Sequence, residues 1–220
     1  PLMWVLLGHG NAAIVPSPTY PVHIFGPLFA GADLRQVPMR SLSDPRVQVD
    51  FEGDFFDSLA TAYEVGWPKP RVLVISFPHN PTTTVVDAAF MQRVVDFARE
   101  QELIVVHDFA YADIAFDGQV PPSILQAEGA TEVAVELYTL TKSFSMAGWR
   151  VGFVVGNAEI VGALARLKSY LDYGTFQPIQ IAAIVAMNEA PDFPREVCEV
   201  YRARRDALCA AASATTPTDA

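Results

Sequence analysis

Cysteine is scarce in this chain of 220 residues, which contains two, Cys198 and Cys209. Both lie in a stretch with a helical pattern, where the rise along the helix places them roughly 16 Å apart. A disulfide requires Cα atoms within about 7 Å of each other, so the two cysteines cannot pair. No cysteine spacing typical of a zinc site is present, and we predict no metal site. We expect two ordinary thiols in a reducing compartment, with the cytoplasm as the default location.

Basic residues are also few. Lysine and arginine number 15 against 25 aspartates and glutamates, which gives a net charge of −10. No basic stripe is available to neutralise phosphates, so the composition argues against a general nucleic-acid-binding protein and favours one that acts on small molecules. Apolar residues make up 51% and charged residues 18% of the chain, a balance that predicts a folded protein with one large domain.

Residues 1–32 contain no Asp, Glu, Lys or Arg, a pattern that raises the question of a signal peptide or a membrane span. Glycines and prolines interrupt every apolar run well short of the roughly 20 residues that a membrane helix needs. The basic start of a signal peptide is also missing. We therefore interpret this segment as buried interior and expect no membrane association. The abrupt start PLMWVLL and the end ASATTPTDA favour a piece of a longer protein.

Short apolar runs bounded by turn residues alternate along the chain with helical patterns. The runs, which are typical of strands buried on both faces, are residues 12–15, 71–77, 103–107, 133–139 and 150–156. The helical patterns are residues 87–101, 158–171, 178–190 and 193–212. Asp87 is placed to cap the first of these helices. The alternation predicts an α/β domain with a mainly parallel sheet sandwiched by helices.

Polar residues follow three of the predicted strands. Asn80 comes after RVLVISF, Asp108 comes after LIVVH, and Lys142 comes after VAVELYT. In a largely parallel sheet, ligands bind beyond the carboxyl ends of the strands. We therefore expect these three side chains to converge on one crevice.

Each of these residues also has an ordinary explanation. Asn80 before a proline is typical of a turn, Asp108 is a plausible cap, and an isolated lysine is more often a surface residue than a catalytic one. The tripeptide TKS at Lys142 resembles the end of a phosphate-binding P-loop, but Glu136 and Thr141 stand where that loop needs glycine. GHGN near the start is too short for a dinucleotide-binding fingerprint. The order and spacing of the features together favour a shared site.

Four segments together carry a resemblance to a known family: PSPTYP, PHNPT, HDFAYADI and TLTKSFSMAGWRVGF. They resemble the signature blocks of fold-type I, pyridoxal-phosphate-dependent aminotransferases of class I/II. The runs YTLTKSFSMAGWRVGFVVGN and KSYLDYGTFQPIQIAA are most similar to the alanine and LL-diaminopimelate aminotransferase branch. The resemblance implies that residues 1–190 form the cofactor-binding large domain, incomplete at its N-terminal side. Residues 191–220 are then a helix leading into a truncated small domain.

The resemblance implies a role for each matching residue. Lys142 is expected to form a Schiff base with the aldehyde of pyridoxal 5′-phosphate, and Asp108 is expected to face the pyridine nitrogen. Asn80 and Tyr111 are expected to face the 3′-oxygen of the cofactor. These residue types suit the tasks, because a carboxylate keeps the ring nitrogen protonated and the two donors stabilise the 3′-oxyanion. Once free, Lys142 is expected to move a proton from the substrate Cα.

Three further residues complete the implied site. Tyr20 is expected to stack on the cofactor ring, and Thr139 and Arg150 are expected to hold the phosphate, for which a guanidinium offers two parallel donors. Thr139 stands where many members of the family have serine, and Thr83 stands where glycine is frequent. The hydroxyl is kept at Thr139, so we expect little effect there.

Two parts of the family's site are expected to lie outside residues 1–220. These are the loop that donates backbone amides to the phosphate and the arginine that grips the substrate carboxylate. We therefore expect the 220-residue chain alone to bind the cofactor weakly and to transaminate poorly or not at all. The resemblance also implies a homodimer in the full-length protein, with residues 170–178 as a candidate interface segment.

Three functions stay open from the sequence. The first is an aminotransferase that moves an amino group between an alanine-like or diaminopimelate-like amino acid and a 2-oxo acid. The second is another fold-type I activity, a carbon–sulfur lyase or a synthase, which shares Lys142, Asp108 and Asn80. The third is a non-catalytic binding or dimerisation module from a truncated gene. Retention of every cofactor-facing residue favours an enzyme.

Overall fold

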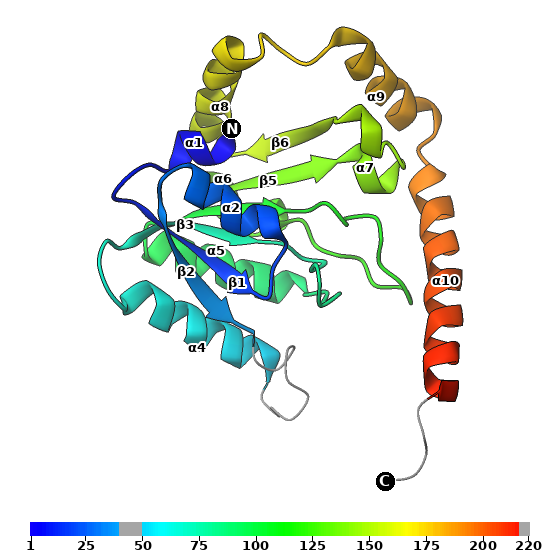
Figure 1. The fold of residues 1–220 in the computed structure, drawn as a ribbon, viewed down its shortest axis with the longest axis horizontal. Coiled ribbons are helices and arrows are strands. Elements are labelled where there is room, and N and C mark those ends of the chain that lie inside the picture. The colour runs from blue at the N-terminus through cyan, green and yellow to red at the C-terminus, as the bar shows by residue number, and fades with distance from the viewer. Residues whose placement is uncertain (40–49, 216–220) are drawn as a thin grey trace.

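One sheet of six strands organises the part of the chain that the computed structural model describes, residues 1–39 and 50–215 (Figure 1). The first five strands in the chain are parallel to their neighbours, and the sixth is antiparallel to the fifth. The mainly parallel α/β sheet predicted from the sequence is therefore confirmed. The spatial order is β2-β1-β3-β4-β5-β6, with bounds β1 (Ala12–Ser17), β2 (Asp33–Pro38), β3 (Pro70–Ile75), β4 (Ile104–Asp108), β5 (Ala134–Thr139) and β6 (Gly152–Gly156).

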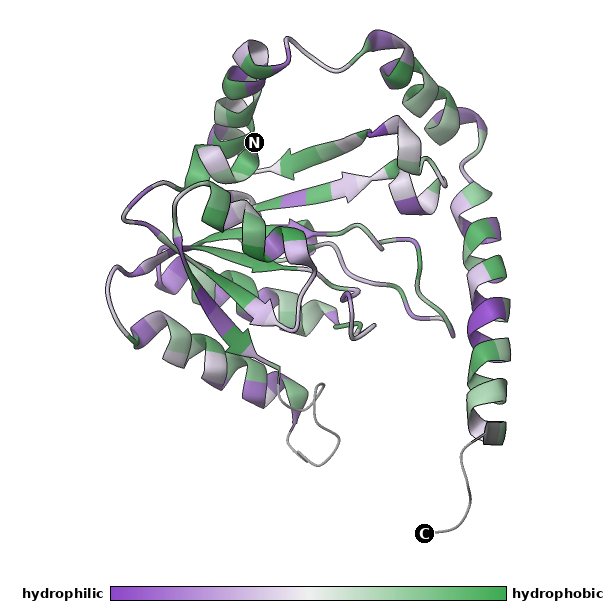
Figure 2. Ribbon diagram, in the orientation of Figure 1, coloured by the Kyte–Doolittle hydropathy of each residue, from purple (hydrophilic) through white to green (hydrophobic). Residues whose placement is uncertain are grey.

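Helices cover both faces of the sheet, because strand residues alternate between two apolar cores. Leu73 and Ile75 of β3 belong to the core beneath α4 and α5, and Val72 and Val74 belong to the core beneath α1, α2 and α8. The central strands are coloured mostly as hydrophobic in Figure 2, as expected for strands buried on both faces. The helix bounds are α1 (Leu2–Leu6), α2 (Pro21–Phe29), α4 (Phe51–Glu64), α5 (Ala88–Glu100) and α8 (Ala158–Leu171).

The helices predicted from the sequence are all present. The carboxylate of Asp87 accepts a hydrogen bond from Phe90 N at 2.8 Å and so caps α5, as predicted. The buried face of α5 includes Val94 and Ala98. The other predicted helices correspond to α8, α9 (Gln177–Glu189) and α10 (Phe193–Thr215). Sequence reasoning missed β2, α1, α2 and α4.

The interpretation of residues 1–32 as buried interior is correct for β1 but wrong for α2. Ala12 and Val15 of β1 are fully buried, whereas Phe25 and Phe29 of α2 are 50% and 77% exposed. The apolar residues of this segment therefore lie in two different environments. Those of β1 are in the core, and several of those of α2 are on the molecular surface. Among the described residues, no helix is both long and apolar enough to span a bilayer.

Helix α10 runs along one side of the molecule, away from the sheet (Figure 1). Cys198 and Cys209 both lie on it and are free thiols, as predicted. Arg205 of α10 forms an ion pair with Asp117 in the segment that follows β4. This contact ties α10 to the segment that also carries Tyr111.

Candidate functional site

The three polar residues predicted to converge lie at the carboxyl-terminal ends of adjacent strands of the sheet. Asp108 is the last residue of β4, and Lys142 belongs to α7 (Leu140–Ser143), the single helical turn that directly follows β5. Asn80 lies in the turn after β3, the strand on the other side of β4. Because β3, β4 and β5 are adjacent and parallel, their carboxyl ends deliver these side chains to one side of the fold.

Tyr111 connects the side chains of Asn80 and Lys142. The amide Nδ2 of Asn80 donates a hydrogen bond to the Tyr111 hydroxyl at 3.2 Å. The Nζ atom of Lys142 lies 5.6 Å from the centre of the Tyr111 ring, within the range of a cation–π contact. An amide, a phenol and a primary amine from three separate segments therefore form one cluster.

Lys142 differs from the other two lysines of the chain in its surroundings. Lys69 donates to the carbonyl oxygens at the end of α4, and Lys168 pairs with Asp172 one helical turn away. Within the described residues, the Lys142 amine makes no hydrogen bond or ion pair and lies over the aromatic ring of Tyr111. Its side chain is exposed, so the amine is accessible to a ligand.

A buried histidine holds the carboxylate of Asp108. His23 of α2 is 5% exposed, and its Nε2 lies 2.8 Å from Asp108 Oδ2. Its other ring nitrogen, Nδ1, lies 2.8 Å from the hydroxyl of Thr19. The ring of Tyr20 meets the His23 ring edge-on, at 5.9 Å between centres, and Tyr20 itself is 44% exposed. Tyr20 and Asp108 are therefore linked through His23, a residue that sequence reasoning missed.

Thr139 and Arg150 lie at the end of the β5–β6 pair. The hydroxyl of Thr139 accepts a hydrogen bond from Thr141 N at 3.2 Å and thereby caps α7. Arg150 adopts the left-handed conformation, with φ 55°, and its guanidinium donates to the carbonyl of Ala147 in its own turn at 3.0 Å. Both residues are near the Lys142 turn in the chain, but the Arg150 head group is engaged within its own turn.

A second polar network lies beneath the turn that carries Asn80. His107 and Glu136 are buried on β4 and β5, and His107 Nδ1 lies 3.0 Å from Glu136 Oε2. The other ring nitrogen of His107, Nε2, lies 3.2 Å from the carbonyl oxygen of Phe77, where the turn begins. Glu136 also accepts hydrogen bonds from the Ser123 hydroxyl at 2.9 Å and from Ile124 N at 2.9 Å. The network fixes the starting point of the Asn80 turn.

His79, next to Asn80, is a buried side chain with one unsatisfied nitrogen. Its Nδ1 lies 2.8 Å from the Thr82 hydroxyl, while Nε2 has no partner among the described residues. Burial, and to a smaller extent the nearby His23, lowers the pKa of His79 to about 4.

Thr83, in the same turn, has φ 61°, a left-handed conformation that explains why glycine suits this position.

The low pKa of His79 predicts a loss of stability in acid. The unfolded chain takes up this proton near pH 6.5, but the folded chain does so only near pH 4, so protonation favours unfolding as the pH falls between these values. Above pH 6.5, His79 is neutral in both states and its titration does not change the free energy of unfolding. Between pH 6.5 and about pH 4, its protonation lowers the free energy of unfolding by at most about 1.4 kcal/mol per pH unit. Urea unfolding of the wild type and of His79→Asn at pH 7, 5.5 and 4.5 measures it. We expect a shallower pH dependence for the variant, and equal slopes would contradict the assignment.

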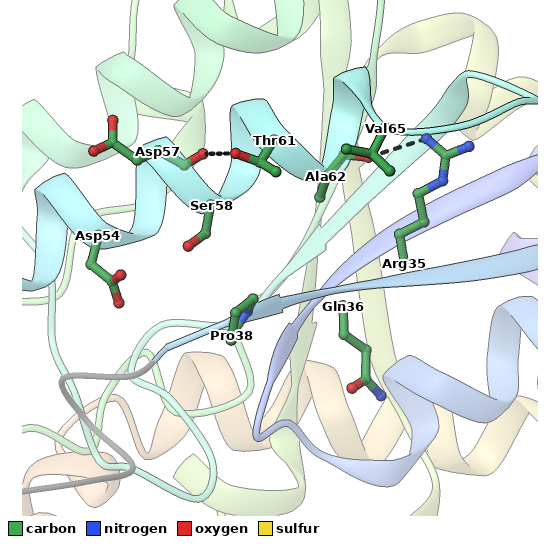
Figure 3. Close-up of a pocket in the computed structure, with 9 residues that line it drawn as sticks. All are labelled: Arg35, Gln36, Pro38, Asp54, Asp57, Ser58, Thr61, Ala62 and Val65. Carbon is green, nitrogen blue, oxygen red and sulfur yellow. Dashed lines mark hydrogen bonds between the residues drawn. The ribbon is translucent and has the colours of Figure 1, made fainter. Parts of the chain in front are cut away.

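Two surface hollows differ in their relation to this cluster. The hollow between β2 and α4, about 620 Å³ in volume, contains none of the candidate residues (Figure 3). Arg35 on its wall donates to the carbonyl of Ala62 at 3.1 Å, so this arginine is used to close the end of α4. A second hollow, of about 600 Å³, has Asn80 and Tyr111 on its wall together with Arg205 of α10. The second hollow is the one beside the candidate site.

Comparison with known proteins identifies the family. The sequence model described as aminotransferase class I and II matches residues 2–215. The chain therefore belongs to the class I and II aminotransferase family, whose members typically depend on pyridoxal phosphate. The resemblance carried by the four sequence segments is confirmed.

The chain matches both curated relatives and solved structures over about half of their length. It is 48% identical over 208 residues to the glutamate-pyruvate aminotransferase AlaC of Escherichia coli K12, a match that covers 94% of this chain and 48% of AlaC. It is 42% identical to an LL-diaminopimelate aminotransferase of Desulforudis audaxviator, with coverage of 93% and 50%. The substrate-bound BacF structure from Bacillus subtilis has a TM-score of 0.81 at 35% identity, with coverage of 94% and 51%.

Proposed function

We propose that this chain provides the cofactor-binding part of an aminotransferase that moves an amino group between an amino acid and a 2-oxo acid. The amino acid is alanine-like or diaminopimelate-like, because a glutamate-pyruvate aminotransferase, whose transfer to pyruvate yields alanine, and an LL-diaminopimelate aminotransferase are among the similar proteins. The observation that carries the proposal is the cluster of Asn80, Tyr111 and Lys142, with Asp108 at the end of the neighbouring strand.

The chemistry of the donor set fits pyridoxal phosphate. Asp108 presents a carboxylate whose side chain is 24% exposed and is held by His23, which suits a partner for the ring nitrogen. Asn80 and Tyr111 present an amide and a phenol side by side, which suits a pair of donors to the 3′-oxygen. Lys142 presents an accessible amine for the aldehyde. Tyr20 would lie against the ring.

Phosphate binding by Thr139 and Arg150 requires their head groups to change partners. The Thr139 hydroxyl caps α7, and the Arg150 guanidinium bonds to Ala147. The Thr139 hydroxyl also bonds to Thr141 Oγ1 at 3.0 Å and to Val151 O at 3.2 Å. The Arg150 bond is exposed and goes to a neutral carbonyl oxygen, and a phosphate dianion is a stronger acceptor for a guanidinium than a carbonyl oxygen is. We propose that these two residues supply part of the phosphate site.

The residues of the chain divide the work of the reaction. Bound pyridoxal phosphate supplies an aldehyde and a ring that accepts electrons. Asp108 holds negative charge against the ring nitrogen, and His23 keeps the Asp108 carboxylate in place. Lys142 Nζ would accept the proton that leaves the substrate Cα and later return a proton, because it is the amine of the cluster and lies over the Tyr111 ring.

We further propose how the chain is divided and assembled. Residues 1–190 would form the cofactor-binding domain, and residues 191–220, which include the whole of α10, would lead into a second domain. The exposed apolar side chains of Tyr170, Tyr173 and Phe176 suit an interface in a homodimer of the full-length protein.

A single-turnover experiment tests the proposed reaction. The chain is incubated with excess pyridoxal phosphate and L-alanine or LL-diaminopimelate, and the products are quantified by chromatography. We expect the 2-oxo acid and pyridoxamine phosphate to form slowly, in equal amounts, and faster than with Lys142→Ala, which reports the background of the free cofactor. A parallel incubation with L-cystathionine, which carries a Cβ–S bond, tests the lyase alternative, and release of a thiol and ammonia there without pyridoxamine phosphate would indicate a lyase. Products at the background rate alone would mean that residues 1–220 do not catalyse the transfer by themselves.

A further inference from the structure

Asp113 joins two segments that reach the candidate site from different directions. It lies two positions after Tyr111, in the segment that follows β4. Its Oδ2 atom accepts a hydrogen bond from the Ser143 hydroxyl at 2.6 Å and another from the Tyr138 hydroxyl at 2.6 Å. Ser143 is the residue after Lys142, and Tyr138 is near the end of β5. One carboxylate oxygen thus fixes both ends of the short stretch that contains Lys142.

The Lys142 turn has little structure of its own to hold it in place. Helix α7 has four residues, Leu140–Ser143, and a helix of this length is not stable without tertiary contacts. Leu140 and Ser143 are fully buried, and these two side chains anchor the turn. The anchor at Leu140 is apolar and permits rotation, whereas the hydrogen bond from Ser143 to a carboxylate fixes an orientation.

The two donors to Asp113 are suited to a persistent contact. Hydrogen bonds from hydroxyls to an ionised carboxylate are about twice as strong as neutral ones, and both distances here are at the short end of the range. Burial, with the bond to Asp113 as the next cause, raises the pKa of Tyr138 to about 12. The Tyr138 hydroxyl therefore keeps its proton, and donates it, throughout the physiological pH range.

We propose that Asp113 is a positioning residue that holds the Lys142 amine against Tyr111 by binding Ser143 and Tyr138. The same short segment carries Tyr111, so moving Asp113 relative to α7 moves the two reactive side chains apart. We call the two hydrogen bonds from Ser143 and Tyr138 to Asp113 the Asp113 clamp. The clamp maintains the distance of 5.6 Å between Lys142 Nζ and the centre of the Tyr111 ring. The role of the clamp in catalysis rests on the proposed function of Lys142. The two hydrogen bonds themselves do not depend on that function.

The first test measures the clamp without any cofactor. Hydrogen exchange at the backbone amides of residues 138–144 is followed by mass spectrometry in the wild type, Asp113→Asn, Ser143→Ala and Tyr138→Phe. Asp117→Asn is the matched control, because Asp117 is also an exposed aspartate of this segment but pairs with Arg205. We expect about tenfold faster exchange in the three clamp variants, as the loss of a charge-assisted bond predicts, and wild-type exchange in Asp117→Asn.

The second test measures the position of the Lys142 amine. Each variant is treated briefly with pyridoxal phosphate and borohydride, and the extent of labelling is mapped at Lys142 and Lys168 in the same sample. We expect the ratio of Lys142 to Lys168 labelling to fall about tenfold in Asp113→Asn, because a neutral amide oxygen accepts both hydroxyl bonds more weakly than a carboxylate does. The ratio should fall less in Ser143→Ala and Tyr138→Phe, which each keep one bond to the carboxylate. Thermal unfolding identifies any variant that fails to fold, and the two single-hydroxyl variants retain the shape of the residues they replace.

The outcomes separate this proposal from the proposed function. Unchanged exchange and an unchanged labelling ratio in folded Asp113→Asn overturn the clamp. Faster exchange with an unchanged ratio also overturns it, because Asp113 is then structural only. If wild-type Lys142 is labelled no more than Lys168, the proposed function fails and the positioning role fails with it. Faster exchange together with a lower ratio supports the proposal.

Discussion

Replacement of Lys142 by alanine is expected to abolish the covalent capture of pyridoxal phosphate by this chain. The Lys142 amine is exposed, makes no hydrogen bond or ion pair among the described residues, and lies over the Tyr111 ring beside the Asn80 amide. The aldehyde of pyridoxal phosphate reacts with an accessible amine, and the 3′-oxygen of its ring binds hydrogen-bond donors. Both an accessible amine and such donors occur at Lys142. Titration with excess pyridoxal phosphate should produce an absorbance band near ~420 nm in the wild type and none in Lys142→Ala.

Lys168→Ala is the matched control for that experiment. Lys168 is also a partly exposed lysine, but its amine is paired with Asp172 on the surface of α8. The variant should keep the full band, and borohydride reduction followed by mass spectrometry should locate the added mass on Lys142. A band of wild-type intensity in Lys142→Ala would show that the amine belongs to another residue and would remove the basis of the proposed reaction.

Replacement of Glu136 by alanine is expected to lower the free energy of unfolding by about 3–5 kcal/mol, a large part of the stability of an ordinary domain. Glu136 is 6% exposed, and its carboxylate accepts hydrogen bonds from Ser123 and from Ile124 N in addition to its contact with His107. Alanine leaves these donors buried without an acceptor, and buried polar groups without partners are costly. Urea unfolding at pH 7, followed by circular dichroism, measures the loss.

Two further variants identify the cause of that loss. Glu132→Ala removes a glutamate that is 62% exposed and pairs with Arg99 on the surface, so it should cost less than about 1 kcal/mol. Glu136→Gln keeps an oxygen acceptor but offers only one, so an intermediate loss is expected. A loss below about 1 kcal/mol for Glu136→Ala itself would mean that the buried network contributes little to folding.

The sequence predicts the centre of the fold better than its margins, for a physical reason. Strands β3, β4 and β5 are largely buried on both faces and therefore appear as near-continuous apolar runs. Edge strand β2 has mixed composition, DLRQVP, and only its Val37 is fully buried, so its sequence resembles a loop. Helix α4 does carry a recognisable start signal, because Asp50 caps it by accepting from Gly53 N, but consecutive phenylalanines blur its apolar face.

The candidate site follows the same division. Asn80, Asp108 and Lys142 were predictable because each follows a recognisable strand. His23 was not, because it meets Asp108 across 85 positions of the chain, and only the placement of α2 against the sheet brings the two together. The bonds of Asp113 to Tyr138 and Ser143 likewise span 25 and 30 positions. Local patterns locate reactive residues, whereas their supporting contacts depend on tertiary structure.

The position of β6 has a practical consequence for work with this chain. In the described part of the chain it is the last strand of the sheet beyond β5, and its Phe153 and Val155 are 37% and 45% exposed. An accessible strand edge with apolar side chains is a template for strand pairing between molecules. We therefore expect concentrated samples to self-associate through this strand, and Val155→Lys to reduce the association without changing the cluster of Asn80, Tyr111 and Lys142.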